Sequence, residues 1–462
     1  MQINVEKKFQ IDQHLKTAVH KKIAADQAGP MQQQQLLSEC LNTTSTLNAF
    51  NKDLCQMMIR CNIPLHNLEV NDFKIFLEKY TGQTVLSRRT VCRSYLPEVY
   101  EDCMDRIKAA LRNKYIWFSV DETTDSLGRY IANFVVGVLD GKPSACYLVG
   151  VKQLDRTNSV TISRFVNDCL SALYLPEAVP SDKILFMVTD AAKYMIKAGE
   201  HLKIFYPNLS HLTCLAHGIN RVAETIRTEY PLVNKLINNG KKIFLKAPTR
   251  VQVYKDYLPN VPLPPQPILT RWGTWIEAAL FYADNFQGFK NVVESFDVDT
   301  STSITDCQQI LKNKNIITQL SQIKVYFFQI PDIIKKLEAR NLKLSESLML
   351  IDRLETKLKE NSSEIGKKVL LKFVDVIKKN ASIEILKNVD CALSGGNIEE
   401  AAFFPKNILT PDIIPNLLYC PVTSCDVERS FSRYGNILAD NRHNFLIENL
   451  EKHLIVNYNR DE

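Results

Sequence analysis

The chain has 462 residues, of which 45% are hydrophobic and 23% charged, and 57 Lys and Arg against 51 Asp and Glu give a formal net charge of +6. This composition is ordinary for a globular protein and excludes wholly disordered, fibrous and membrane-embedded classes. No apolar run approaches the ~18–20 residues that a membrane span requires, and the first thirty residues are polar. We therefore expect a protein that is neither secreted nor bound to a membrane.

The twelve cysteines do not form a disulfide framework. They are spread from Cys40 to Cys425 and contain no Cys-x-x-Cys pair. This usage is typical of reduced thiols in the cytosol or nucleus, so we expect no disulfides.

Residues 1–36 are polar and end in a glutamine-rich stretch that predicts a linker. His14 and His20 lie in this segment among lysines, at a spacing that resembles the histidine half of a zinc finger. The cysteine half would lie upstream, and no cysteine precedes Cys40. Because two ligands cannot fold a finger, we expect a truncated remnant without zinc, and the alternative is a solvated basic helix.

Residues 37–114 predict a small helical domain. Apolar residues recur there at helical spacing, as at Phe73, Phe76 and Leu77, and Pro64 is a breaker. A run of arginines further along makes part of its surface basic.

Residues 115–230 change to short β-branched and aromatic runs. They predict three strands, then a helix, a strand, a helix, a short strand and a further helix. The second and third strands are joined by Asp140-Gly141, a strong hairpin signal. The first four strands are expected at 115–120, 130–139, 145–154 and 183–189.

Two aspartates follow strands in this pattern. Right-handed crossovers place the strand that ends at Thr189 parallel to, and beside, the strand that ends at Val120. Asp121 and Asp190 are then expected side by side at the carboxyl ends of these two strands. The order predicts an α/β core.

The remaining chain predicts a mostly helical, Lys-rich segment over 231–405 and a final block over 406–462. In the final block, Thr423 and Ser424 are expected N-caps of a helix with Glu428 in its first turn.

Two aspartates at strand ends and one distant glutamate match the ligand preference of Mg²⁺ or Mn²⁺, which bind carboxylate oxygens. Two such ions can hold the attacking and leaving oxygens of a phosphoryl transfer. Asp121, Asp190 and Glu428 are therefore the candidate catalytic and metal-binding residues. Each of them, taken alone, is also explained as a loop or capping carboxylate.

Two further motifs contain residues that suit a nucleic acid. Cys214 and His217 have metal-ligand spacing, but no second pair completes a zinc site, so contact between His217 and a phosphate is the sharper hypothesis. Arg271, Trp272 and Trp275 lie together, and an aromatic side chain beside an arginine can stack on a base and bind phosphate. The alternative for the tryptophans is a place in the core.

In this order the motifs resemble the hAT superfamily of DNA transposases and their host-derived descendants. The resemblance covers about 118–457 through FSVDETTD, MVTDAAKYM, CLAH, TRWGTW and PVTSCDVERSFSRYG. It implies an RNase H-like core over 115–230 with a helical insertion, completed over 406–462 by the dimerisation region. It also implies the Asp121, Asp190 and Glu428 triad, with Arg271, Trp272 and His217 on DNA.

The amino-terminal part is similar to the CGG triplet repeat-binding protein, a nuclear DNA-binding regulator of transcription. The similar segments are HLKTAVHKKIAADQ, CNIPLHNLEVNDFKIFLEKYTG and RSYLPEVYED. Three departures stand out: the finger cysteines are absent, Asp190 is followed by two alanines, and the insertion is smaller than an active element implies.

We expect a transposase-derived nuclear protein that binds DNA, dimerises and regulates transcription, without a small-molecule cofactor. The alternative is a working cut-and-paste transposase with two Mg²⁺ or Mn²⁺ ions, and a third class is a protein-interaction scaffold. Self-association is expected through apolar residues of the C-terminal block that need not pack on the core, namely Phe445, Leu446, Leu450 and Leu454.

Overall fold

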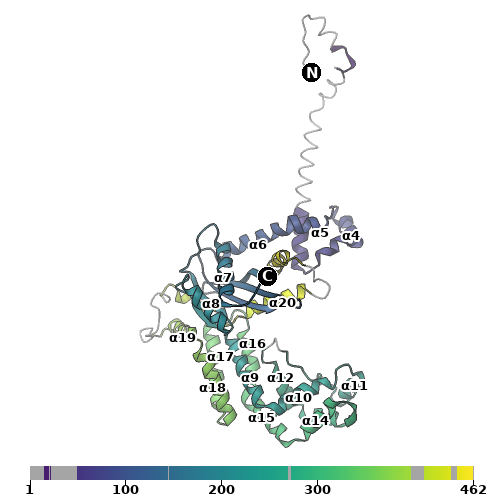
Figure 1. Ribbon diagram of the computed structural model, residues 1–462, viewed down its shortest axis with the longest axis vertical. Helices are drawn as coiled ribbons and strands as arrows, with labels where there is room; N and C mark the ends of the chain where they lie inside the picture. The colour runs from purple at the N-terminus through teal and green to yellow at the C-terminus, as the bar shows by residue number, and fades with distance from the viewer. Residues whose placement is uncertain are drawn as a thin grey trace. The chain divides into compact units, whose positions relative to one another are not determined.

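The computed structural model describes residues 15–19, 21, 49–143, 145–268, 272–396, 410–438 and 445–460 (Figure 1). The chain divides into two compact units, Met1–Cys103 with Arg460–Glu462, and Met104–Asn459. The division falls inside helix α6 (Leu96–Leu111), earlier than the expected boundary at residue 114, because the last turns of this helix belong to the second unit.

The first unit is helical. It contains a helix over 49–60, the 3-10 helix η1 (Leu65–Glu69), helices α4 (Asn71–Thr81) and α5 (Arg88–Thr90), the π-helical segment η2 (Val91–Tyr95) and the start of α6. Its buried side chains come from every one of these elements except α4 and α5 and include Met58, Ile59, Leu68, Val91 and Val99. Helix α4 is capped at its C-terminus by Gly82, whose φ of 66° lies in the left-handed region that glycine enters most readily.

The second unit is built on one five-stranded sheet with the order β3-β2-β1-β4-β5. Strands β1, β2 and β3 pair antiparallel, whereas β4 pairs parallel with β1, and β5 pairs parallel with β4. The α/β fold and the predicted parallel pairing of the first and fourth strands are confirmed. The strands are β1 (Tyr115–Thr124), β2 (Tyr130–Leu139), β3 (Cys146–Leu154), β4 (Ile184–Thr189) and β5 (Ser210–Thr213).

The strands are apolar because both faces of the sheet are covered. Every residue of β4 is buried, and so is every residue of β2 after the first. Helix α7 (Ser159–Tyr174) packs on β3 and on α8 (Lys193–Lys203), and α9 (Leu215–Glu229) follows β5. The predicted turn between β2 and β3 contains Gly141 at a φ of 73°, where an added Cβ would lie 2.6 Å from the carbonyl oxygen of Pro415.

The described part of the insertion consists of helices and connecting loops without a strand, and its apolar side chains join those of β4 and α9 in one core cluster. Helices α17 and α18 lie side by side within it (Figure 1). Its elements are α10 (Pro231–Lys242), α11 (Pro248–Tyr257), α12 (Thr274–Asp284), α13 (Phe286–Glu294), η3 (Val298–Thr300), α14 (Thr302–Lys312), α15 (Lys314–Phe327), α16 (Gln329–Leu337), α17 (Leu344–Lys359), α18 (Glu364–Lys378) and α19 (Ser382–Leu393).

The chain then returns to the sheet. The 3-10 helix η4 (Ile414–Leu417) precedes α20 (Cys425–Ile437), which packs on β1 and β2, and α21 (Ile447–Tyr458), which packs on β3. Ser424 occupies the N-cap position of α20 as predicted, but its side chain makes no capping hydrogen bond. No helix in the described ranges is long and apolar enough to cross a membrane, and every described cysteine is a free thiol.

Candidate functional site

Asp121 lies on β1, and Asp190 lies at the carboxyl end of the neighbouring parallel strand β4. Strand β4 stops at Thr189, and Asp190 follows it directly. The expectation that the first strand ends at Val120 is wrong, because β1 continues to Thr124 while it pairs with β2. The charge of Asp190 acts on Asp121, as its position on the neighbouring strand requires.

Helix α20 brings Glu428 to Asp121 from the far end of the second unit. Both carboxyl groups line the same cleft. Burial of Asp121, then the charge of Glu428 and hydrogen bonding with its side chain, raise the pKa of Asp121 well above its usual value. The charges of Glu122 and Asp190 act in the same direction. Carboxyl groups packed in this way need a shared proton or a cation between them.

Two sets of contacts hold α20 on the sheet. The side-chain amide of Asn133 on β2 donates a 2.6 Å hydrogen bond to the hydroxyl oxygen of Ser430. Nearby, Oδ2 of Asp125 accepts from Nε of Arg129 at 2.7 Å and from the hydroxyl of Tyr434 at 2.9 Å. Ser430 and Tyr434 follow Glu428 along the same helix, so these bonds fix the helix that carries the glutamate.

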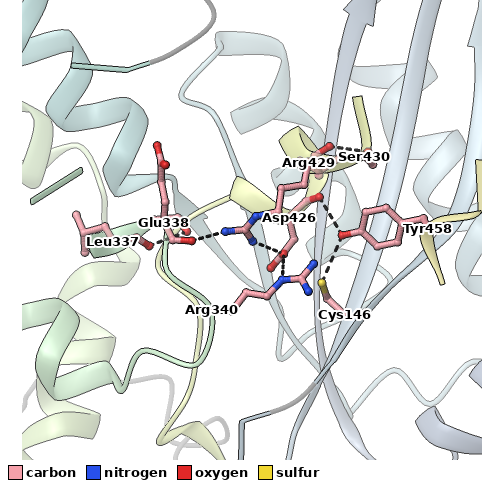
Figure 2. A network of polar contacts seen from close by, with 10 residues as sticks. Cys146, Leu337, Glu338, Arg340, Asp426, Arg429, Ser430 and Tyr458 are labelled. Carbon is pink, nitrogen blue, oxygen red and sulfur yellow. Dashed lines mark hydrogen bonds and ion pairs between the residues drawn. The ribbon is translucent and has the colours of Figure 1, made fainter. Parts of the chain in front are cut away.

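Asp426 anchors the first turn of the same helix (Figure 2). Its Oδ1 accepts hydrogen bonds from Nε of Arg340 at 3.2 Å and from Nη1 of Arg429 at 2.5 Å. Arg429 also donates to the backbone carbonyl of Glu338, and the hydroxyl of Tyr458 donates to the carbonyl of Asp426 at 3.1 Å. The network therefore joins the end of α16, the start of α20 and the end of α21.

The Cys-x-x-His motif also contacts α20. The backbone N–H of Cys214 donates to the carbonyl of Thr189 at 2.7 Å, and its sulfur accepts from the N–H of Ser424 at 3.3 Å. Burial by itself raises the pKa of the Cys214 thiol, but its interaction with His217 outweighs burial and lowers it. Nε2 of His217 lies 3.7 Å from Oε1 of Glu428, so the motif connects β4 to the glutamate.

Of the tryptophan pair, only Trp272 belongs to the site. Its ring contacts the ring of His217, with centroids 4.4 Å apart and planes inclined by 58°. Trp275 is buried, and its Nε1 donates to Oδ1 of Asn234 at 3.0 Å, so it is a core residue. Arg271 lies outside the described residues.

These groups open into a cleft of about 920 Å³. Its walls come from β1, α9, α12, α16 and α20 and contain five carboxylates against the cations Lys335 and Arg429 and the imidazole of His217. Asp190 is not among the residues that line the cleft. The five carboxylates are Asp121, Glu122, Glu277, Glu338 and Glu428.

Glu122 is a site residue that the sequence did not single out. Its Oε1 accepts a hydrogen bond from the hydroxyl of Tyr194 on α8, and its Oε2 is buried without a hydrogen-bond partner among the described residues. Burial raises its pKa, and the hydrogen bond from Tyr194 opposes the rise. Strand alternation predicts that Glu122 points away from the face of Asp121, so only the structure shows that both line the cleft.

The predicted metal ligands suit a hard cation in donor type, since all three are carboxylates and Asp121 and Glu428 are already in contact. One oxygen of Asp190 accepts from the N–H of Ala192 at 3.0 Å. As the described side chains stand, no three or more His, Cys, Asp or Glu residues form a group that could hold a metal ion. His14 and His20 of the finger remnant lie outside the described residues.

The residues expected to mediate dimerisation have different environments. Leu450 and Leu454 are fully buried in the core of their own unit, where α21 packs on β3, so they are not a free surface. Leu446 is 72% exposed. The ring of Phe445 contacts the ring of His453 edge-on, with centroids 5.6 Å apart. More residues of the C-terminal block are buried in the core than expected, because α21 packs on β3 at the edge of the sheet.

Comparison with family models gives a match for part of the chain. Residues 87–243 match the family described as "Domain of unknown function (DUF659)", a family commonly found in hAT-like transposase-derived proteins. The matched range contains Asp121, Asp190 and the Cys-x-x-His motif, and ends just after α10, the first helix of the insertion. No curated protein matches the chain.

Proposed function

We propose that this chain is a nuclear DNA-binding protein derived from a hAT transposase, and that its cleft receives a DNA strand when divalent cations neutralise the carboxylates. The observation that carries the proposal is the contact between Asp121 and Glu428, which lie far apart in the sequence. The hAT resemblance and the matched domain family point to the same ancestry.

Charge decides how DNA would enter. Five carboxylates face Lys335, Arg429 and His217 in the cleft, and Arg429 is engaged with Asp426 and the carbonyl of Glu338. A polyanion is repelled by this lining until cations offset it. Asp121, Asp190 and Glu428 would hold Mg²⁺ or Mn²⁺, which supply that positive charge when bound. Trp272 offers a stacking surface beside His217.

Strand cleavage is the second candidate, because all three carboxylates of the transposase triad are present. In this reading Asp121, Asp190 and Glu428 would hold the ions, which would supply Lewis-acid activation of the phosphodiester. The chain's own groups act around them: Trp272 stacks on a displaced base, His217 contacts a phosphate, and the α20 contacts keep Glu428 in place. Self-association through the C-terminal block and regulation of transcription belong to the first candidate.

Fluorescence anisotropy with labelled DNA tests the binding proposal. We expect binding that weakens with salt and is at least tenfold tighter in Mn²⁺ than in EDTA. Asp190→Asn should remove the Mn²⁺ enhancement, whereas Asp168→Asn, a change at an exposed aspartate paired with Lys152, should not. Binding that is equal with and without the metal would contradict the proposed role of the cleft.

The same samples separate the candidates. Incubation with Mn²⁺ and DNA that carries candidate terminal repeats should leave the DNA intact if the chain only binds. Nicked or hairpin products that disappear in Asp190→Asn would establish cleavage. If neither cleavage products nor salt-sensitive DNA binding are observed, the protein-interaction scaffold is the function that remains.

A further inference from the structure

Helix α4 of the first unit, labelled in Figure 1, carries a stripe of exposed apolar side chains. None of its residues is buried. Ile75, Phe76 and Tyr80 are 60%, 60% and 68% exposed, and the rings of Phe76 and Tyr80 contact each other with centroids 4.9 Å apart and planes inclined by 51°. The side-chain amine of Lys79 lies 5.1 Å from the centre of the Tyr80 ring. Contiguous exposed apolar side chains of this kind mark an interaction surface.

The stripe has a charge at each end. Positions 72, 75, 76, 79 and 80 share one face of a helix, so Asp72 lies at the start of the stripe and Lys79 near its end. Neither forms an ion pair within the part of the chain that the structure describes. The helix's other two charges, Lys74 and Glu78, pair with each other at 3.9 Å.

The charge balance of α4 favours a protein partner over a nucleic acid. Its two acidic and two basic side chains cancel. A surface for DNA needs an excess of positive charge, and this stripe has an aspartate on it. The partner must instead offer an apolar surface flanked by a positive and a negative group.

We propose that the partner is a second copy of this chain, with two α4 helices packed antiparallel about a two-fold axis. Asp72 and Lys79 are equidistant from the midpoint between Ile75 and Phe76. The axis therefore sets Asp72 of each copy against Lys79 of the other, and Ile75 against Phe76. A two-fold interface requires such self-complementarity, and antiparallel helices also oppose their dipoles favourably. One helix pair is smaller than a standard interface of about 1,200–2,000 Å², so the association is expected to be weak.

Sedimentation velocity of the full chain over a concentration series tests the pairing. Asp72→Lys sets lysine against lysine and should raise the dissociation constant at least tenfold, and Lys79→Asp should do the same. The double variant Asp72→Lys, Lys79→Asp restores opposite charges and should return the constant to that of the wild type. Phe76→Asp should abolish this contact, whereas Met349→Asp, a change at an equally exposed apolar residue of the second unit, should not.

Photo-crosslinking identifies the occupant. Benzoylphenylalanine at position 76, in a mixture of ¹⁴N and ¹⁵N chains, should produce crosslinked peptides that join α4 of one chain to α4 of another. Crosslinks confined to one chain would overturn the proposal, because a segment of the same chain would then cover the stripe. It would also be overturned by folded single variants whose dissociation constant is unchanged, or by a double variant that fails to restore association. DNA that crosslinks at position 76 would overturn it as well.

Discussion

Asn133 lies opposite Asp121 in the β1–β2 ladder, and its side-chain amide donates a 2.6 Å hydrogen bond to Ser430, two residues after Glu428. Ser430 in turn donates to the carbonyl of Val427 at 2.5 Å. Both Asn133 and Ser430 are fully buried. Strand β2, which pairs with the strand of Asp121, therefore also holds helix α20, which carries Glu428.

Ser430→Ala should show how much the hydrogen bond between Asn133 and Ser430 contributes to the free energy of unfolding. It leaves the buried amide of Asn133 without its acceptor, which should lower the free energy of unfolding by roughly 1–3 kcal/mol. Ser432→Ala, a change at an exposed residue of the same helix, should cost well under 1 kcal/mol. Urea unfolding of both variants measures the difference, and equal values would show that the bond does not stabilise the docked helix.

The contacts of Asp125 predict a pH dependence. Burial opposes its charge, but hydrogen bonds from the backbone N–H and guanidinium of Arg129 and from Tyr434 lower its pKa below the usual value. The charged form is therefore favoured by folding, and its stabilising contribution is present above the unfolded pKa of ~3.9 and lost as pH falls through the folded pKa.

Asp125→Asn tests this sign. The variant should be less stable than the wild type by about 2 kcal/mol at pH 7, and the two stabilities should converge below pH 4. Unfolding measured from pH 7 to pH 3 gives both curves, and Asp168→Asn is the exposed control. A difference that grows as pH falls would contradict the assignment.

Loss of Asp426 should destabilise the protein more than loss of Arg340, one of the two arginines that it binds. Arg340 is 41% exposed, so Arg340→Ala should cost about 1 kcal/mol or less. Asp426→Ala removes the acceptor of both arginines at a side chain only 18% exposed and should cost more, roughly 2–3 kcal/mol. Thermal and urea unfolding compare them. If Arg340→Ala proves the more costly change, the network does not centre on Asp426.

Glu428→Gln should stabilise the protein when no metal is present. It removes one of two carboxyl groups in contact, and relief of their repulsion should add about 1 kcal/mol to the free energy of unfolding. The wild type should gain stability from Mn²⁺, and the variant should gain much less. Melting curves with and without Mn²⁺ measure this, with Glu384→Gln as the exposed control. A variant less stable than the wild type without metal would show that the carboxyl pair is favourable.

The C-terminal block permits a clean separation of folding from self-association. Leu446→Asp should leave the melting temperature nearly unchanged, because the side chain is 72% exposed, and should reduce any dimer formed through this block. Leu450→Ala should lower the free energy of unfolding by roughly 2–5 kcal/mol, because the side chain is fully buried. Light scattering and thermal melting are measured together. An unchanged mass for Leu446→Asp would remove this surface from the dimer prediction.

Local pattern was enough to predict several features. β-branched runs and an Asp-Gly turn predicted the three antiparallel strands, and the handedness of crossovers placed the strands of Asp121 and Asp190 in parallel. Apolar spacing predicted the helix around Phe76. Each of these depends on neighbours within a few residues, or on a chirality rule that every sheet obeys.

Other features depend on pairs that are distant in sequence. Asn133 meets Ser430 across 297 residues, and Tyr434 meets Asp125 across 309. No periodicity encodes such a pair, so the approach of Glu428 to Asp121 rested on a resemblance until the docked helix showed it.

Whether an apolar helix face is buried also depends on the tertiary structure. Leu450 and Phe76 lie in equally regular helical patterns, yet the first is fully buried and the second is 60% exposed. A helical period fixes which side chains share a face, but burial requires a second element packed against that face. For Leu450 that element is β3, which precedes the insertion in the sequence, whereas the helix of Leu450 follows it.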